Sequence, residues 1–228
     1  MNTIIQEIGC IETNDIYIKR EDLIPFSFGG NKARKAKYFF DEIDSQSYDS
    51  VVTYGSSSSN HCRIISNLAA KRKMECYIVS PEEASEPTFN SELIDLFGAK
   101  TITVPTQEVH DTIERILREL KNDGKTPYFI PGGGHGNLGT TAYLDCYNEI
   151  CKYEKENNVK FDYIFHASGT GTTQAGLIVG KLYHSDDRKI IGISIARRNP
   201  YGRNVVLESV NSFVNSQGRN IDVEVIEK

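Results

Sequence analysis

The regular alternation of short strand-forming runs with longer amphipathic stretches constrains this chain most. Runs of β-branched and aromatic residues favour strands, and apolar residues spaced three and four apart favour helices. Strands that alternate with helices are typical of an α/β fold with parallel sheets. The expected strands are Ile16 to Lys19, Val51 to Tyr54, Cys76 to Ser80, Lys100 to Val104, Tyr128 to Ile130, Tyr163 to His166, Ile190 to Ile195 and Ile221 to Ile226. The expected helices are Asn31 to Ile43, Asn60 to Lys71, Thr88 to Phe97, Val109 to Asn122, Leu138 to Cys151 and Thr172 to Tyr183.

Charge and composition point to a small-molecule ligand. The 26 basic and 31 acidic residues give a net charge of −5 without a long block of either sign, so we expect neither nucleic acid nor a membrane surface as a partner. No run reaches ~18 apolar residues, and residues 1–9 have neither a basic region nor an apolar run, which predicts a cytoplasmic protein. The five cysteines form no C-x-x-C pair, so we expect neither a disulfide framework nor a metal site.

The run Ser168 to Gly176 has the composition of an anion-binding loop. Glycines let the backbone turn its N–H groups inward, hydroxyl side chains add donors, and the start of the following helix adds partial positive charge. The run matches neither G-x-G-x-x-G nor a P-loop, so a dinucleotide or a nucleoside triphosphate is not expected. A phosphate group is the predicted ligand, and an ordinary glycine- and threonine-rich turn is the alternative.

Lys32 follows two glycines at the start of an expected helix. A cation at this end of a helix opposes the helix dipole, and burial and the charges of Arg34 and Lys35 act in the same direction. These influences favour the neutral amine, which is the form that a Schiff base requires. A solvated basic helix start is the alternative interpretation.

Four serines, Asn60 and His61 follow the expected strand that ends at Tyr54. Their hydroxyl and amide groups predict a pocket floor rich in hydrogen-bond donors. Serine and asparagine also cap helices, so simple capping is the alternative.

A second glycine-rich strand exit extends from Pro131 to Tyr143. Glycines in such a loop either let the backbone approach a ligand closely or serve only the geometry of the turn. The residues favour neither interpretation over the other.

In their order and spacing, these four segments resemble the family of 1-aminocyclopropane-1-carboxylate deaminases and D-cysteine desulfhydrases, which use pyridoxal 5'-phosphate (PLP). Residues 19–23 (K-R-E-D-L) and 29–35 are similar to the family's cofactor-lysine motif, and Ser59 lies 27 positions after Lys32 (59 minus 32), a separation like the family's. The resemblance covers about residues 15–226. It implies a two-domain α/β fold of the tryptophan-synthase-β type (PLP fold type II), with open, twisted parallel sheets and flanking helices.

The resemblance also assigns roles by position. Lys32 would carry PLP, Asn60 would bond the phenolic oxygen of the cofactor, and Ser59 would serve as acid, base or nucleophile. The residues expected to bind the substrate are Ser59, Asn60 and His61. Histidine at position 61 is typical of the desulfhydrases, since the deaminases tend to have glutamine here. The residues expected to hold the phosphate are Ser168, Gly169, Thr170, Gly171, Thr172 and Thr173.

The resemblance further implies domain boundaries and a missing portion. Residues 1–40 and 152–228 would form the large, PLP-anchoring domain, and residues 41–151 the small α/β domain. Members of the family continue beyond the position of Lys228, and there the resemblance places the partner of the pyridine nitrogen and tyrosines that line the substrate. The large domain is therefore expected to be incomplete and to expose a sheet edge or an apolar face.

Three functions follow as hypotheses. The first is a PLP-dependent lyase or deaminase that releases ammonia and a keto acid from a small amino acid. The resemblance implies that such an enzyme is a homodimer. The second is a truncated or split relative that binds PLP or a complementing subunit without turnover. The third is an α/β module that binds a phosphometabolite through residues 168–173 without PLP.

Overall fold

A computed structural model describes residues 1–218, so the strand expected from Ile221 to Ile226 lies outside the described residues. The chain divides into two compact units. The continuous unit is Pro25–Gly134, and the discontinuous unit combines Met1–Ile24 with His135–Lys228. Relative to the expected domains, residues 25–40 therefore belong to the continuous unit and residues 135–151 to the discontinuous one. Which unit anchors PLP stays a prediction.

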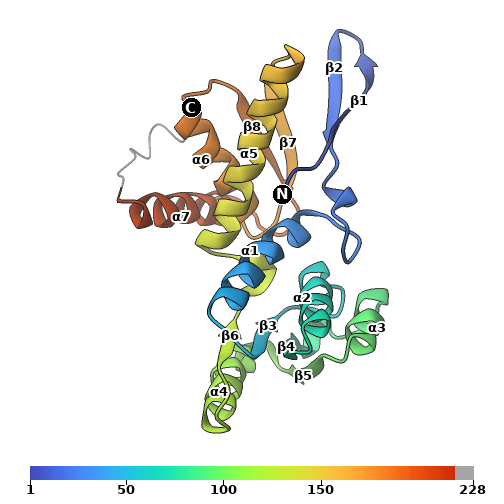
Figure 1. The fold of residues 1–228 in the computed structure, drawn as a ribbon, viewed down its shortest axis with the longest axis vertical. Coiled ribbons are helices and arrows are strands. Elements are labelled where there is room, and N and C mark those ends of the chain that lie inside the picture. Colours follow the sequence, from blue (N-terminus) through green and yellow to red (C-terminus); the bar gives the residue numbers. More distant parts are fainter. Residues whose placement is uncertain (219–228) are drawn as a thin grey trace. The chain divides into compact units, whose positions relative to one another are not determined.

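The continuous unit is built around a four-stranded parallel sheet of order β5-β4-β3-β6 (Figure 1). Its strands are β3 (Ser50–Tyr54), β4 (Glu75–Pro81), β5 (Lys100–Val104) and β6 (Pro127–Phe129). Its helices are α1 (Asn31–Ser45), α2 (Asn60–Lys71), α3 (Phe89–Leu96) and α4 (Val109–Asn122). This arrangement confirms the predicted α/β class.

Side chains of this sheet alternate between two covered faces, because successive residues of a strand point in opposite directions. Val52 and Val79 point to one face and form a buried core with α4. The α4 residues of that core are Ile113, Ile116 and Leu120. Thr53 points to the other face, where its hydroxyl contacts His61 of α2. The α2 face of the sheet therefore carries the polar groups of interest.

The discontinuous unit contains a hairpin, a second parallel sheet and three helices. The antiparallel hairpin pairs β1 (Ile5–Ile11) with β2 (Asn14–Lys19), and the parallel sheet pairs β7 (Tyr163–Ser168) with β8 (Lys189–Ser194). The helices are α5 (Asn137–Asn157), α6 (Thr172–His184) and α7 (Tyr201–Ser216). A Cβ on Gly176 or Gly180 of α6 would lie within 2.5 Å of a Tyr143 or Tyr147 atom of α5, so only glycine allows this close helix packing.

One face of the β7–β8 sheet is apolar and exposed. Tyr163, Phe165 and Ile193 have exposed fractions of 52%, 67% and 56%. The exposed apolar face that the sequence predicts is therefore present in the described part of the chain. Within residues 1–218, no helix combines the length and the apolar composition that a membrane-spanning segment requires.

Besides short 3-10 helices, the structure adds one strand and one α-helix that the sequence did not predict, β1 and α7. Most of β1 is exposed, so it lacks the apolar alternation that marks a half-buried strand. Helix α7 is rich in valine, asparagine and serine, which have low helix propensity. Burial of Val210, Phe213 and Val214 against α6 stabilises it instead. The other expected elements of residues 1–218 are confirmed, with ends that shift by one or two residues except at the end of α5, which extends from the expected Cys151 to Asn157.

Candidate functional site

Lys32 lies in the first turn of α1, two residues after the N-cap Gly30, which adopts φ of 89°. Its side chain is half-buried, and burial lowers the pKa of its amine below the ordinary value. Lys35, one turn further, is fully buried, and burial together with the charge of Lys32 lowers its pKa well below the ordinary value. Both shifts favour a neutral amine, in the direction that the sequence predicts for Lys32.

His61 is buried at the start of α2 and held in one tautomer. Its Nε2 lies 2.9 Å from Thr53 Oγ1, and the Thr53 hydroxyl donates to the Ile130 carbonyl at 2.7 Å. Because the single hydroxyl proton of Thr53 is used there, His61 Nε2 must be the donor to Thr53, and Nδ1 carries the lone pair. Burial, with smaller contributions from the charges of Lys32 and Lys35, lowers the pKa of His61 to about 3, so the ring is neutral.

Ser59 and Asn60 occupy the N-terminus of α2. Ser59 is the N-cap, and its Oγ accepts a hydrogen bond from the Cys62 backbone N–H at 3.2 Å. The capping interpretation is therefore correct for Ser59, although its hydroxyl proton remains available for donation. Asn60 is exposed, and its Oδ1 accepts hydrogen bonds from Arg63 and Asn90.

The glycines that follow β6 have structural reasons of their own. A Cβ on Gly132 would lie 2.7 Å from the ring of Tyr54, which stacks on Phe129 with an interplanar angle of 9°. Gly134 adopts φ of 66° and lies against the Lys35 side chain. The turn-geometry interpretation therefore accounts for these glycines without a ligand.

The predicted phosphate loop connects β7 to α6 in the discontinuous unit. Gly171 adopts φ of 86° as the N-cap, and a Cβ there would lie 3.3 Å from the Val206 backbone nitrogen. The Thr172 hydroxyl is already hydrogen-bonded to His135 Nδ1 at 2.9 Å. Thr170 Oγ1 is buried and has no hydrogen-bond partner among residues 1–218. An anionic group with acceptor oxygens would satisfy this hydroxyl.

A cavity of about 260 Å³ opens beside this loop. Ser168 and Gly169 contribute to its wall, together with residues of α6, β8 and α7. The Arg197 guanidinium donates to the Gly169 carbonyl, which fixes the loop to the residues after β8. Of the residues expected to hold the phosphate, 168–173, only Ser168 and Gly169 line the cavity, so the cavity lies beside the Thr170 hydroxyl and does not enclose it.

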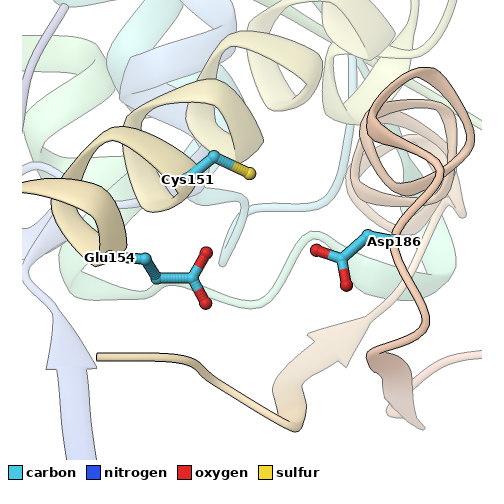
Figure 2. Close-up of side chains that lie close together, drawn as sticks. All are labelled: Cys151, Glu154 and Asp186. Carbon is cyan, nitrogen blue, oxygen red and sulfur yellow. The ribbon is translucent and has the colours of Figure 1, made fainter. Parts of the chain in front are cut away.

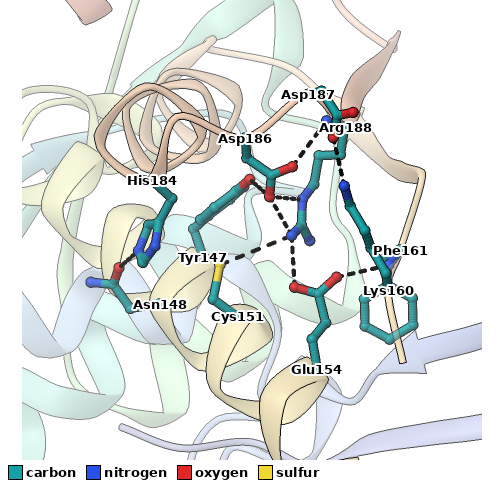
Figure 3. A network of polar contacts seen from close by, with 10 residues as sticks. All are labelled: Tyr147, Asn148, Cys151, Glu154, Lys160, Phe161, His184, Asp186, Asp187 and Arg188. Atoms are coloured by element: carbon teal, nitrogen blue, oxygen red, sulfur yellow. Dashed lines mark hydrogen bonds and ion pairs between the residues drawn. The ribbon is translucent and has the colours of Figure 1, made fainter. Parts of the chain in front are cut away.

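Cys151, Glu154 and Asp186 lie close enough together to suggest a metal site (Figure 2). Figure 3 shows that the Arg188 guanidinium lies among them, with Nη2 bonded to Glu154 at 2.7 Å and Nε bonded to Asp186 at 2.6 Å. Burial raises the pKa of Asp186, but hydrogen bonds from Arg188 and Tyr147 outweigh it and hold that pKa below the usual range. One guanidinium thus already bonds both carboxylates, and the cluster is a charged network that joins α5 to the start of β8.

The predicted site residues belong to both units. Lys32, Ser59, Asn60 and His61 lie in the continuous unit, and residues 168–173 lie in the discontinuous unit. Sequence reasoning missed Thr53, Arg63 and Asn90, which contact the predicted residues of the continuous unit. The spacing of Arg63, three residues after Asn60 on one helix, was a usable signal, since such residues are neighbours.

Among known protein families, the one described as pyridoxal-phosphate dependent enzyme matches residues 3–224 of this chain. A D-cysteine desulfhydrase of Serratia proteamaculans is 33% identical over 195 residues, which cover 81% of this chain and 58% of that protein. A putative 1-aminocyclopropane-1-carboxylate deaminase of Pyrococcus horikoshii is 36% identical over 197 residues, covering 85% of this chain and 58% of that one. The chain thus spans less than two thirds of the length of these relatives.

Solved structures agree in fold. The crystal structure of an ACC deaminase homologue superposes with a TM-score of 0.84 at 30% identity, covering 97% of this chain and 69% of that one. A PLP-dependent aspartate racemase superposes with a TM-score of 0.60 at 19% identity, covering 79% of this chain and 51% of that one. The second likeness shows the fold alone, because one fold supports several reactions.

Proposed function

Because this chain belongs to the pyridoxal-phosphate dependent enzymes, in the group of 1-aminocyclopropane-1-carboxylate deaminases and D-cysteine desulfhydrases, we propose that it is a PLP-dependent lyase or deaminase of a small amino acid. Its products would be ammonia and a keto acid. His61 supports a desulfhydrase-like reaction, since the deaminases tend to have glutamine at this position. The D-cysteine desulfhydrase of Serratia proteamaculans is similar over most of this chain, which supports D-cysteine as the first substrate to test.

The observation that carries the proposal is the half-buried Lys32 amine. Its lowered pKa raises the fraction of neutral amine available to attack the cofactor aldehyde. The Thr170 hydroxyl, which has no hydrogen-bond partner in the described part of the chain, is consistent with a phosphate ligand. Each of the two units, taken by itself, therefore carries a feature that suits one group of PLP: an amine for the aldehyde in the continuous unit and a hydroxyl donor for the phosphate in the discontinuous unit.

The chain's own residues would then hold the cofactor and move protons. PLP, once bound, withdraws electrons from the substrate Cα and so makes its proton removable. The Lys32 amine would hold the cofactor and would also be the group that takes up that proton. The Ser59 hydroxyl retains a proton to donate beside the substrate, and the Asn60 amide would bond the phenolic oxygen of the cofactor.

Chemical trapping tests the role of Lys32. After incubation with PLP and borohydride reduction, mass spectrometry of a digest is expected to find the cofactor on Lys32. Lys32→Ala should abolish this labelling. Lys37→Ala is the matched control, because Lys37 lies on the same helix with a side chain 42% exposed and should leave the labelling intact. Labelling at another lysine, or no uptake of PLP by the wild type, would refute the proposal.

Turnover and assembly are tested separately. A keto-acid assay over D- and L-amino acids is expected to give product with D-cysteine, and PLP uptake without any product would contradict the lyase proposal. The exposed β7–β8 face supports a second copy or a complementing subunit as a partner. Sedimentation of the purified chain is expected to show a dimer if the partner is a second copy. The cytoplasmic location stays a prediction.

A further inference from the structure

Arg63 is a buried cation for which the proposed reaction has no use. Its side chain projects from α2, and the residue has an exposed fraction of 8%. Nη1 donates to Asn60 Oδ1 at 2.8 Å and to Asn90 Oδ1 at 2.7 Å, and Nη2 donates to the Ser27 carbonyl at 3.0 Å. One guanidinium therefore joins three segments of the continuous unit.

These contacts fix which end of the Asn60 amide faces inward. A guanidinium can only donate hydrogen bonds, so the Asn60 atom beside Arg63 must be the oxygen. The Asn90 amide nitrogen also donates to Asn60 Oδ1, at 3.1 Å, and to the Ser58 carbonyl, at 2.7 Å. With two donors on its oxygen, the exposed Asn60 side chain must present its NH₂ group on the other side.

The third contact of Arg63 holds the loop that leads into α1. Residues 27–30 all have positive φ, which is unfavourable for Ser27 and Phe28 because they carry a Cβ. The Arg63 guanidinium bonds the Ser27 carbonyl and lies 5.1 Å from the centre of the Phe28 ring. The loop ends two residues before Lys32, so Arg63 connects the segment that carries this lysine to Asn60.

We propose that Arg63, supported by Asn90, is a positioning residue that makes the Asn60 amide a fixed hydrogen-bond donor to the phenolic oxygen of PLP. The inference rests on the proposed function, because it requires PLP on Lys32. An amide free to rotate would present its oxygen to this electron-rich atom part of the time, and that contact is repulsive. Donation by NH₂ instead stabilises the negatively charged form of the phenolic oxygen.

Spectra and affinity of the PLP-loaded protein test the proposal. Arg63→Met keeps much of the apolar stem and removes every donor. We expect PLP to bind about 10-fold more weakly, the factor for losing one hydrogen bond to a charged acceptor. The bound cofactor should also shift toward its short-wavelength form, in which the phenolic oxygen carries the proton. Arg115→Met, on the exposed face of α4, is the control and should change neither quantity.

A double-mutant cycle separates positioning from simple stabilisation. If Arg63 acts through the Asn60 amide, Arg63→Met should have no further effect on spectrum or affinity in an Asn60→Ala background. An equal effect in both backgrounds, or a wild-type spectrum for Arg63→Met, would overturn the inference. If Arg63→Met does not fold, Asn90→Ala removes the second donor to Asn60 Oδ1. This variant should shift the spectrum in the same direction and weaken PLP binding about 3-fold. An unchanged spectrum of Asn90→Ala would also overturn the inference. Failure of the wild-type protein to bind PLP would instead refute the proposed function.

Discussion

His61 should make the stability of this protein fall as the pH falls below neutrality. Its ordinary pKa is 6.5 and its pKa in the folded chain is about 3, so unfolding below pH 6.5 lets the imidazole take up a proton that the folded state excludes. The contribution is fully present above pH 6.5 and is lost as the pH falls toward 3. One pKa unit corresponds to about 1.4 kcal/mol, so the expected loss is about 1.4 kcal/mol at pH 5.5 and about 2.7 kcal/mol at pH 4.5.

Urea unfolding of the PLP-free protein at pH 7.5, 5.5 and 4.5 measures this loss. His61→Gln can still donate to Thr53 but cannot titrate, so its free energy of unfolding should fall by about 2.7 kcal/mol less than that of the wild type between pH 7.5 and 4.5. His110→Gln removes an exposed imidazole on α4 and is the matched control. Equal losses for the wild type and His61→Gln would refute a buried, neutral imidazole.

Three further changes test packing, charge and ligand binding. Arg188→Met should destabilise the chain by about 3 to 5 kcal/mol, because it leaves the Glu154 and Asp186 carboxylates, which are 11% and 10% exposed, without their cation. Arg198→Met, at an exposed residue, should change stability by less than ~0.5 kcal/mol, and urea unfolding checks both. Gly132→Ala should cost about 1 to 3 kcal/mol, because its Cβ meets the Tyr54 ring, and little in a Tyr54→Ala background. Thr170→Val should weaken PLP binding by roughly 10-fold and leave binding of pyridoxal, which has no phosphate, unchanged in a fluorescence titration.

Much of the continuous unit could be predicted from the sequence, because its signals are local. The expected bounds of α2, α4 and β5 agree with the structure, since apolar spacing and flanking turn residues lie within each segment. The glycine and hydroxyl motifs likewise mark the ends of strands, and the site residues of this unit do lie at the starts of α1 and α2.

The elements that were missed depend on contacts across the fold. Helix α7 is made of weak helix formers and is stabilised by burial against α6, and β1 is defined by its pairing with β2. The motif Gly132 to Gly134 was ambiguous for the same reason: only the position of the Tyr54 ring shows that glycine is needed at residue 132.

Sequence alone predicts the α/β class, the lysine at a helix start and the hydroxyl-rich loops, because each depends on residues that are neighbours along the chain. The folded structure was needed to establish the protonation of His61, the orientation of the Asn60 amide and the nature of the Arg188 cluster. Those properties depend on burial and on hydrogen-bond partners such as Asn90, which lies 30 residues from Asn60 and reaches it only when the chain is folded.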